Sequence, residues 1–193
     1  PRRMLELPER TVYRKIIETG HLAERLGARF LGLGAFTSVV GDAGLTIAES
    51  LEIPVTTGDS YTVAIAVDAI RAAARAMEIP LAGATAAVVG ASGSIGRVCA
   101  EMLAEETAEL ILIGRSEEKL AELRDRLQGP GRARLRTSTR VDDIAEAQLI
   151  LTVTNAIHEV IHPEQLQPGS VVCDVARPRD VSAMVAAVRN DIL

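Results

Sequence analysis

The second half of the chain alternates between short apolar runs and amphipathic segments. Each run is continuously apolar, which is typical of strands that helices cover on both faces. The segments between them have helical spacing, so the pattern predicts parallel strands joined by crossover helices. The expected strands lie near 84–90, 109–114, 133–138, 148–154 and 170–176, and the expected helices near 94–105, 116–128 and 180–190.

The first part of the chain has a different pattern. Segment 32–44 is rich in glycine and poor in charge, which is typical of backbone that passes close to another group. An apolar helix is expected over about 60–78, and Pro80 closes it. The remaining predicted elements are a helix over 11–26 and extended runs at 28–33 and 51–56.

These patterns predict an α/β protein of two parts. Residues 81–193 are expected to form a doubly wound parallel sheet, a Rossmann domain. Residues 1–80 are expected to form part of a smaller α/β substrate domain that ends in the linking helix. The chain begins at Pro1 and ends with residues typical of the start of a strand. We therefore expect further sequence beyond both ends, with the Rossmann domain truncated at its last strand.

Composition narrows the range of partners. The net charge is −5 and aromatic residues make up 2% of the chain, which argues against a nucleic-acid partner. No apolar run is long enough for a membrane span and no leader opens the chain, so the sequence predicts a cytoplasmic protein. Cys99 and Cys173 form no metal-binding or disulfide pattern, so no metal site is expected.

A glycine-rich turn follows the strand near 84–90 and opens the next helix. Its glycines let backbone N–H groups approach a diphosphate, and the positive end of the helix faces the same charge. In this strand–turn–helix context the motif indicates dinucleotide binding; a turn that needs glycine only for packing is the alternative. The cofactor-binding residues predicted here are Gly90, Ala91, Ser92, Gly93, Ser94, Ile95 and Gly96.

The end of the next strand distinguishes NADP from NAD. Enzymes that use NAD commonly have an acidic residue there for the ribose hydroxyls, whereas this chain has Gly114-Arg115-Ser116. Arg115 offers a planar cation to a 2′-phosphate, Ser116 a hydrogen bond and Lys119 a further charge. The sequence therefore predicts NADP(H) as the cofactor. In the alternative interpretation, Ser116 only caps the helix and Arg115 is a surface residue.

The fourth expected strand ends at Thr154-Asn155-Ala156. This is the rim where the nicotinamide lies in a Rossmann fold, so we predict that Thr154, Asn155 and Ala156 contact the cofactor. A plain turn is the alternative. His158 and His162 flank the connection that follows, where a proton-transfer role and a solvent-facing position are both open.

Two dehydrogenase families can be compared on these features. Short-chain dehydrogenases need a Tyr-xxx-Lys pair, and neither Tyr13 nor Tyr61 has a lysine four residues on, so that family is excluded. The order of lobe, linking helix and Rossmann unit resembles shikimate dehydrogenase. That resemblance implies that Thr57-Gly58-Asp59 corresponds to the Asn-Thr-Asp-Gly segment of the family, with Asp59 as a candidate acid. Neither Lys15 nor Lys119 has the motif that surrounds the catalytic lysine of the family, so that lysine is either absent or expected in sequence beyond this chain.

Four stretches carry a second resemblance: Leu31–Ser38, Thr56–Thr62, the glycine turn and Val171–Arg179. They resemble the long-chain acyl-[acyl-carrier-protein] reductases, aldehyde-forming enzymes of cyanobacteria, and their bacterial relatives, from about residue 11 to the end. The resemblance implies NADPH-dependent reduction of a fatty acyl thioester to an aldehyde through an acyl-cysteine. The substrate is then an acyl thioester or another small molecule, with acyl carrier protein as a candidate partner and a homo-oligomer as a candidate assembly.

The nucleophile departs from the pattern of these reductases. The family's cysteine aligns near the start of the last complete strand, where this chain has Ser170, and Cys173 follows. Cys173 is the candidate nucleophile, because Arg177 or Arg179 could supply the cation that activates a thiolate. The alternative is that Cys173 is a small buried hydrophobe, as expected of Cys99.

Loops of the first lobe supply the predicted substrate contacts: Thr37, Ser38, Thr57 and Ser60, beside Asp59. Asp59 and Ser60 could equally be helix caps. Three functions stay open at this point. They are an NADPH-dependent acyl-thioester reductase, a shikimate-type dehydrogenase of a small hydroxy acid or ketone, and a catalytically silent NADP-binding module.

Overall fold

The computed structural model describes residue 4 and the ranges 6–34, 36–42 and 44–193. The chain divides into two compact units, Pro1–Ser60 and Tyr61–Leu193. Ala35 and Ala43, which belong to the glycine-rich segment expected over 32–44, lie outside the described residues, and so does Pro1.

The first unit is a small α/β arrangement. Its two short strands pair in parallel, with Leu31 beside Val55, and its core includes Val12, Ile16 and Ile47. Two helices were not expected from the sequence, because their four and six residues are too few to show helical periodicity. The elements are α1 (Glu9–Arg25), β1 (Leu31–Gly32), α2 (Phe36–Val39), α3 (Leu45–Ser50) and β2 (Val55–Thr56).

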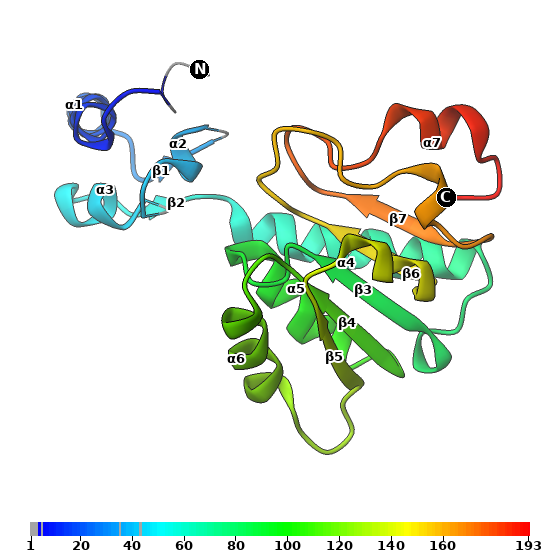
Figure 1. Cartoon of the computed structure of the whole chain (residues 1–193). Helices are drawn as coiled ribbons and strands as arrows, with labels where there is room; N and C mark the ends of the chain where they lie inside the picture. Colours follow the sequence, from blue (N-terminus) through cyan, green and yellow to red (C-terminus); the bar gives the residue numbers. More distant parts are fainter. Residues whose placement is uncertain (1–3, 5, 35, 43) are drawn as a thin grey trace. The chain divides into compact units, whose positions relative to one another are not determined.

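The second unit is a five-stranded sheet in the order β5-β4-β3-β6-β7, and every pair of neighbouring strands is parallel. The predicted Rossmann-type sheet is therefore confirmed (Figure 1). Its strands are β3 (Thr85–Val89), β4 (Glu109–Ile113), β5 (Arg134–Ser138), β6 (Leu149–Thr152) and β7 (Val171–Asp174). Its helices are α4 (Asp59–Ala76), α5 (Ser94–Ala104), α6 (Glu117–Leu127) and α7 (Ala183–Val188). Short 3₁₀ turns lie at Leu81–Gly83, Val141–Glu146 and Pro163–Gln165.

Alternate residues of the strands face two separate cores, as in a sheet covered on both sides. On β3, Ala86 and Val88 pack into a core with residues of α4, α5 and α6. Ala87 and Val89 pack into the opposite core, which includes residues of α7 and of the 3₁₀ turn at Val141–Glu146. The central strands β3, β4 and β6 read as largely apolar because both of their faces are buried, whereas the edge strand β5 carries Arg134 and Arg136 and is partly exposed.

Helix α4 packs with the sheet. The side chains of Val63, Val67 and Ile70 on this helix belong to the same core as Ala86 and Val88 of β3. The compact unit therefore begins near residue 61, earlier than the domain boundary predicted at residue 81, because the apolar face of the linking helix is buried against the Rossmann unit.

Helix α7 is shorter than the helix expected over 180–190. It begins after Ser182, whose hydroxyl accepts a hydrogen bond from the Met184 N–H. It ends at Val188. The backbone of the next residue, Arg189, is extended, and its guanidinium donates to the carboxylate of Asp191 and to main-chain carbonyls. The last residue, Leu193, then pairs with β7 by donating to the Ser170 carbonyl and accepting from the Val172 N–H.

Candidate functional site

The strand order locates the place where a ligand can bind in the second unit. Successive strands β3, β4 and β5 run outward in one direction from the centre, whereas β6 and β7 run outward in the other. In open α/β sheets, the crevice at this reversal, outside the carboxyl ends of the strands, is where ligands bind. Here the reversal lies between β3 and β6.

The glycine turn stands directly at this reversal. The N–H groups of Gly90 and Ala91 both donate to the Ile113 carbonyl, at 2.9 and 3.0 Å, which anchors the turn to the end of β4. Gly90 has a φ of +86°, and a Cβ there would lie 2.7 Å from the Val153 carbonyl oxygen. Only glycine meets both the backbone conformation and the close approach of the β6 chain.

The last glycine of the motif allows α5 to start against the end of β3. A Cβ on Gly96 would lie 2.2 Å from the Gly90 carbonyl oxygen, a distance that no side chain tolerates. Ala91 and Gly96 are buried, while Ser92, Gly93 and Ser94 between them are exposed. The first turn of α5 and the exposed part of the loop can therefore receive an anion at the carboxyl edge.

Arg115 lies at the same edge and reaches across it. Its guanidinium donates to Asn155 Oδ1 at 3.3 Å, so the segments that follow β4 and β6 are joined on either side of β3. Ser116 caps α6, since its hydroxyl accepts from the Lys119 N–H at 3.4 Å. The cap expected as an alternative for Ser116 is thus present, and Lys119 lies exposed in the first turn of α6.

Thr154 and Ala156 are joined to a residue that sequence reasoning missed. The Thr154 hydroxyl donates to Asp180 at 2.5 Å and accepts from the Ala156 N–H at 3.1 Å. Asp180 is fully buried and lies on the connection after β7. No local motif signals this role, because Asp180 is separated from Thr154 along the chain and reads as part of a polar Arg-Pro-Arg-Asp loop.

Cys173 is half-buried in β7 and lies in an environment that keeps it protonated. Its thiol donates to the Ala66 carbonyl at 3.9 Å. Burial raises the pKa of Cys173, and the neighbouring Asp174 carboxylate raises it further. Arg177, which was expected to assist it, donates to the Ala176 carbonyl at 2.9 Å. Ser170 is fully buried at the amino end of β7, the edge opposite the glycine turn.

These pKa shifts predict slow alkylation at neutral pH. Burial raises the pKa of Cys99 to about 11, and Cys173 contributes to that rise. Because iodoacetamide reacts with the thiolate, we expect labelling of either cysteine at pH 7.5 to be at least about tenfold slower than that of a free cysteine, and to accelerate above pH 9. Peptide mapping separates half-buried Cys173 from fully buried Cys99. Rapid labelling of Cys173 at pH 7 would contradict the raised pKa.

The predicted substrate residues and the candidate acid lie at or before the boundary of the first unit. The Thr37 hydroxyl donates to the Gly34 carbonyl at 2.8 Å, and the Thr57 hydroxyl accepts from the Asp59 N–H at 3.4 Å. Asp59 is the first residue of α4 and Ser60 the second. The assignments of Thr37, Ser38, Thr57, Asp59 and Ser60 to a substrate site stay predictions.

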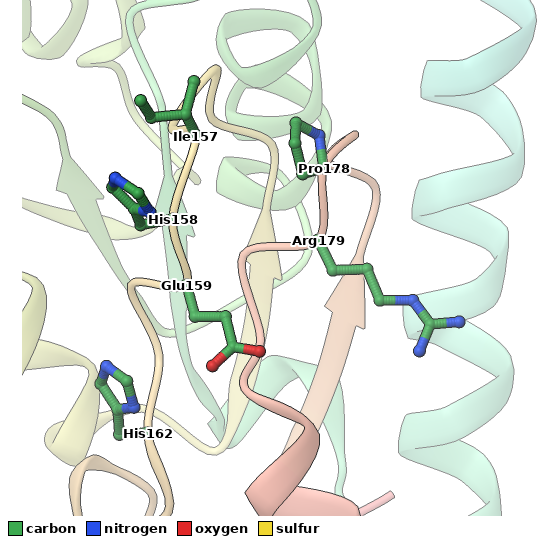
Figure 2. Close-up of a pocket in the computed structure, with 6 residues that line it drawn as sticks. All are labelled: Ile157, His158, Glu159, His162, Pro178 and Arg179. Atoms are coloured by element: carbon green, nitrogen blue, oxygen red, sulfur yellow. The ribbon is translucent and has the colours of Figure 1, made fainter.

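A pocket of about 530 Å³ lies beside the connections that follow β6 and β7. Figure 2 shows His158 and His162 on the same side of one connection, while Arg179 extends away from them toward α4. The two histidines that the sequence singled out therefore line one open hollow. Its lining residues are Ile157, His158, Glu159, His162, Pro178 and Arg179.

The described residues lack the patterns of a metal site and of a membrane-spanning helix. Within them, no three histidine, cysteine, aspartate or glutamate residues are grouped so that they could hold a metal ion. No helix in the same part of the chain is long and apolar enough to cross a membrane.

Comparison with a family model gives a match over most of the second unit. Residues 71–193 match the family described as Shikimate / quinate 5-dehydrogenase. In fold, the chain is similar to the crystal structure of L-tryptophan dehydrogenase from Nostoc punctiforme, with a TM-score of 0.56 and 18% identity, over 94% of this chain and 53% of that one.

Two curated proteins are similar in sequence. The chain is 34% identical over 168 residues to Aminotransferase PigE of a Serratia species, which covers 86% of this chain and 20% of that protein. It is 28% identical over 186 residues to Long-chain acyl-[acyl-carrier-protein] reductase of Synechococcus elongatus, which covers 91% of this chain and 53% of the reductase. The chain thus spans a fifth of one relative and about half of the other.

Proposed function

The chain belongs to the Shikimate / quinate 5-dehydrogenase family, and we propose that it is an oxidoreductase that binds NADPH and reduces a fatty acyl thioester to an aldehyde. The family and the fold support a nicotinamide cofactor. The choice of NADPH and of the substrate is our proposal, which the following features support.

One observation carries the cofactor assignment: Arg115 at the carboxyl end of β4, beside the exposed part of the glycine turn. The Gly90–Gly96 turn exposes Ser92, Gly93 and Ser94 before the first turn of α5, where an anion such as a diphosphate can approach. Arg115 stands where enzymes that use NAD have an acid. A guanidinium binds a 2′-phosphate through paired, charge-assisted hydrogen bonds, so this edge favours NADPH over NADH.

The residues at this edge fit the cofactor in distinct roles. The first turn of α5 would receive the diphosphate, and Arg115, with Ser116 and Lys119, the 2′-phosphate. Residues 154–156 would border the nicotinamide, on the β6 side of the reversal. When bound, NADPH supplies a hydride to the substrate carbonyl.

The acyl-thioester substrate is supported by the similarity to the acyl-[acyl-carrier-protein] reductase along nearly the whole chain. We propose a fatty acyl thioester, presented on acyl carrier protein, as the substrate. An aldehyde is also an amino acceptor in transamination. The similarity to part of a protein named as an aminotransferase therefore suits a module whose product passes to an enzyme of that class.

Cys173 is the nucleophile that we propose for an acyl-enzyme, with Asp59 as a candidate acid. Cys173 precedes the last residue of β7 and so lies near the carboxyl edge. Its thiol must lose a proton before it can attack a thioester, and its raised pKa opposes that step. The proposed mechanism therefore requires bound substrate or cofactor to change the surroundings of the thiol.

A module that binds NADPH without turnover is the second candidate, and the protonated Cys173 favours it. The two can be separated by incubating the chain with NADPH and palmitoyl thioester, following loss of NADPH absorbance and detecting aldehyde by mass spectrometry. The first proposal predicts aldehyde formation that the Cys173→Ala variant loses and the matched Cys99→Ala variant keeps. Binding of NADPH without its oxidation by the thioester, together with no reduction of NADP+ by a hydroxy acid, would favour the silent module.

A further inference from the structure

The carboxylate of Asp180 is the most completely enclosed acidic group at the carboxyl edge. Its exposed fraction is 0%. It accepts hydrogen bonds from the Thr152 hydroxyl at 2.5 Å, the Thr154 N–H at 2.9 Å and the Thr154 hydroxyl at 2.5 Å. All three donors are neutral groups at the end of β6. A buried carboxylate is expensive to desolvate, and it persists only where its lone pairs are satisfied in this manner.

The backbone carbonyl of Asp180 binds a second segment, the one that follows β6. Its carbonyl accepts from the N–H groups of Val160 and Ile161, at 2.8 and 3.0 Å. Ile161 in turn forms a parallel bridge with Val181. Asp180, on the connection after β7, therefore fixes both the end of β6 and the segment that leads away from β6.

Asp174 fixes the other end of the loop that carries Asp180. One of its carboxylate oxygens accepts from the Ala176 N–H at 3.0 Å and the other from the Val181 N–H at 3.1 Å. The loop between β7 and α7 is thus closed on itself by Asp174. Asp180 alone of the two carboxylates reaches across to β6.

The hydrogen bonds of Thr154 show how Asp180 acts on the chain after β6. A hydroxyl has one proton to donate, and that of Thr154 is directed to Asp180. Its oxygen accepts from the Ala156 N–H. Thr154 is therefore occupied on both sides, and its bonds set the path of the backbone through Asn155 and Ala156. The exposed Asn155 side chain is left facing Arg115.

We propose that Asp180 is a positioning residue for the nicotinamide end of the cofactor site, acting through Thr154 on residues 154–156. This inference rests on the proposed binding of NADPH. Asp180 does not touch the cofactor; it determines where the β6 rim stands relative to the glycine turn. Binding of the adenine end, which depends on Arg115 and the turn, does not require Asp180.

The test compares two ligands on the 193-residue chain. NADPH has both ends, whereas adenosine 2′,5′-bisphosphate has the 2′-phosphate but no nicotinamide. We expect Asp180→Asn, which keeps the shape but removes one acceptor, to weaken NADPH about tenfold, as loss of charge-assisted hydrogen bonds predicts. The affinity for the bisphosphate should change by less than about twofold. Calorimetry measures both, and thermal unfolding reports the folded fraction.

Matched variants keep the test decisive. Asp174→Asn alters a carboxylate whose hydrogen bonds go to the Ala176 and Val181 N–H groups of the same loop, so it should leave the ratio of the two affinities near that of the unaltered chain. Thr154→Val should reproduce the effect of Asp180→Asn, whereas Thr154→Ser, which keeps the hydroxyl, should not. If Asp180→Asn does not fold, the comparison of Thr154→Val with Thr154→Ser tests the positioning role.

Each outcome bears on one of the two proposals. A selective loss of NADPH affinity in Asp180→Asn and Thr154→Val supports the positioning role. Equal weakening of both ligands, or no change in either, overturns it and leaves Asp180 a structural residue. If the unaltered chain binds neither ligand, the proposed NADPH function fails instead.

Discussion

Replacing Arg115 with glutamate is expected to raise the Kd for NADPH about a hundredfold, because the change removes charge-assisted hydrogen bonds to the 2′-phosphate and adds a repelling charge. NADH lacks that phosphate, so its Kd should change by less than about threefold. The variant should also fold normally, since the Arg115 side chain is exposed and its one hydrogen bond, to Asn155, is a surface contact. Calorimetric titration with both cofactors measures the two constants.

A control for the change in net charge lies on the neighbouring helix. Arg124 is in the last turn of α6, at the end away from the glycine turn, and pairs with the adjacent Asp125. Arg124→Glu alters the charge of the chain by the same amount and should leave NADPH affinity unchanged. If Arg115→Glu weakened both cofactors equally, Arg115 would bind a part that they share, and the assignment of the 2′-phosphate would be wrong.

Substitution of Gly96 by alanine is expected to have the largest effect on stability. The added Cβ would lie 2.2 Å from the Gly90 carbonyl oxygen, which is a backbone atom, and Gly96 itself is buried. Relief requires α5 to shift from the end of β3, which should cost about 3 kcal/mol of unfolding free energy. Urea denaturation measures that loss, and NADPH binding should fall with it because the turn is displaced.

The neighbouring Gly93 provides the comparison. Its φ is −76°, and a Cβ there would meet only the Gly90 carbonyl oxygen, at 3.3 Å. Gly93→Ala should therefore keep unfolding free energy within about 1 kcal/mol while weakening NADPH, because the methyl group lies on the exposed part of the turn. An unchanged urea midpoint in Gly96→Ala would show that the helix and strand do not meet as closely as these distances require.

The sheet could be predicted from sequence because its strands are buried on both faces. In β4, for example, Leu110–Ile113 is apolar throughout, and the helix that follows is capped by Ser116. The shortest helices could not be predicted, because they contain too few residues to show a pattern. Helices α2 and α3 have four and six residues, too few for a clear period. The extended run expected over 28–33 is present but pairs only at Leu31 and Gly32.

The candidate site could be predicted only where it is local in sequence. The glycine turn and Arg115 are contiguous with strands whose ends identify them. The contact between Arg115 and Asn155, and the three bonds to Asp180, join residues far apart in the chain. Such contacts depend on the order of strands in the sheet, which hydrophobic periodicity does not specify. The environment of Cys173 is likewise a property of packing against α4.

The most direct test is calorimetric titration of the unaltered 193-residue chain with NADPH and, separately, with NADH. If the glycine turn and Arg115 form an NADP site, NADPH should bind with a Kd in the micromolar range and at least about tenfold more tightly than NADH. Absence of heat with NADPH from a folded sample, or tighter binding of NADH, would contradict that claim.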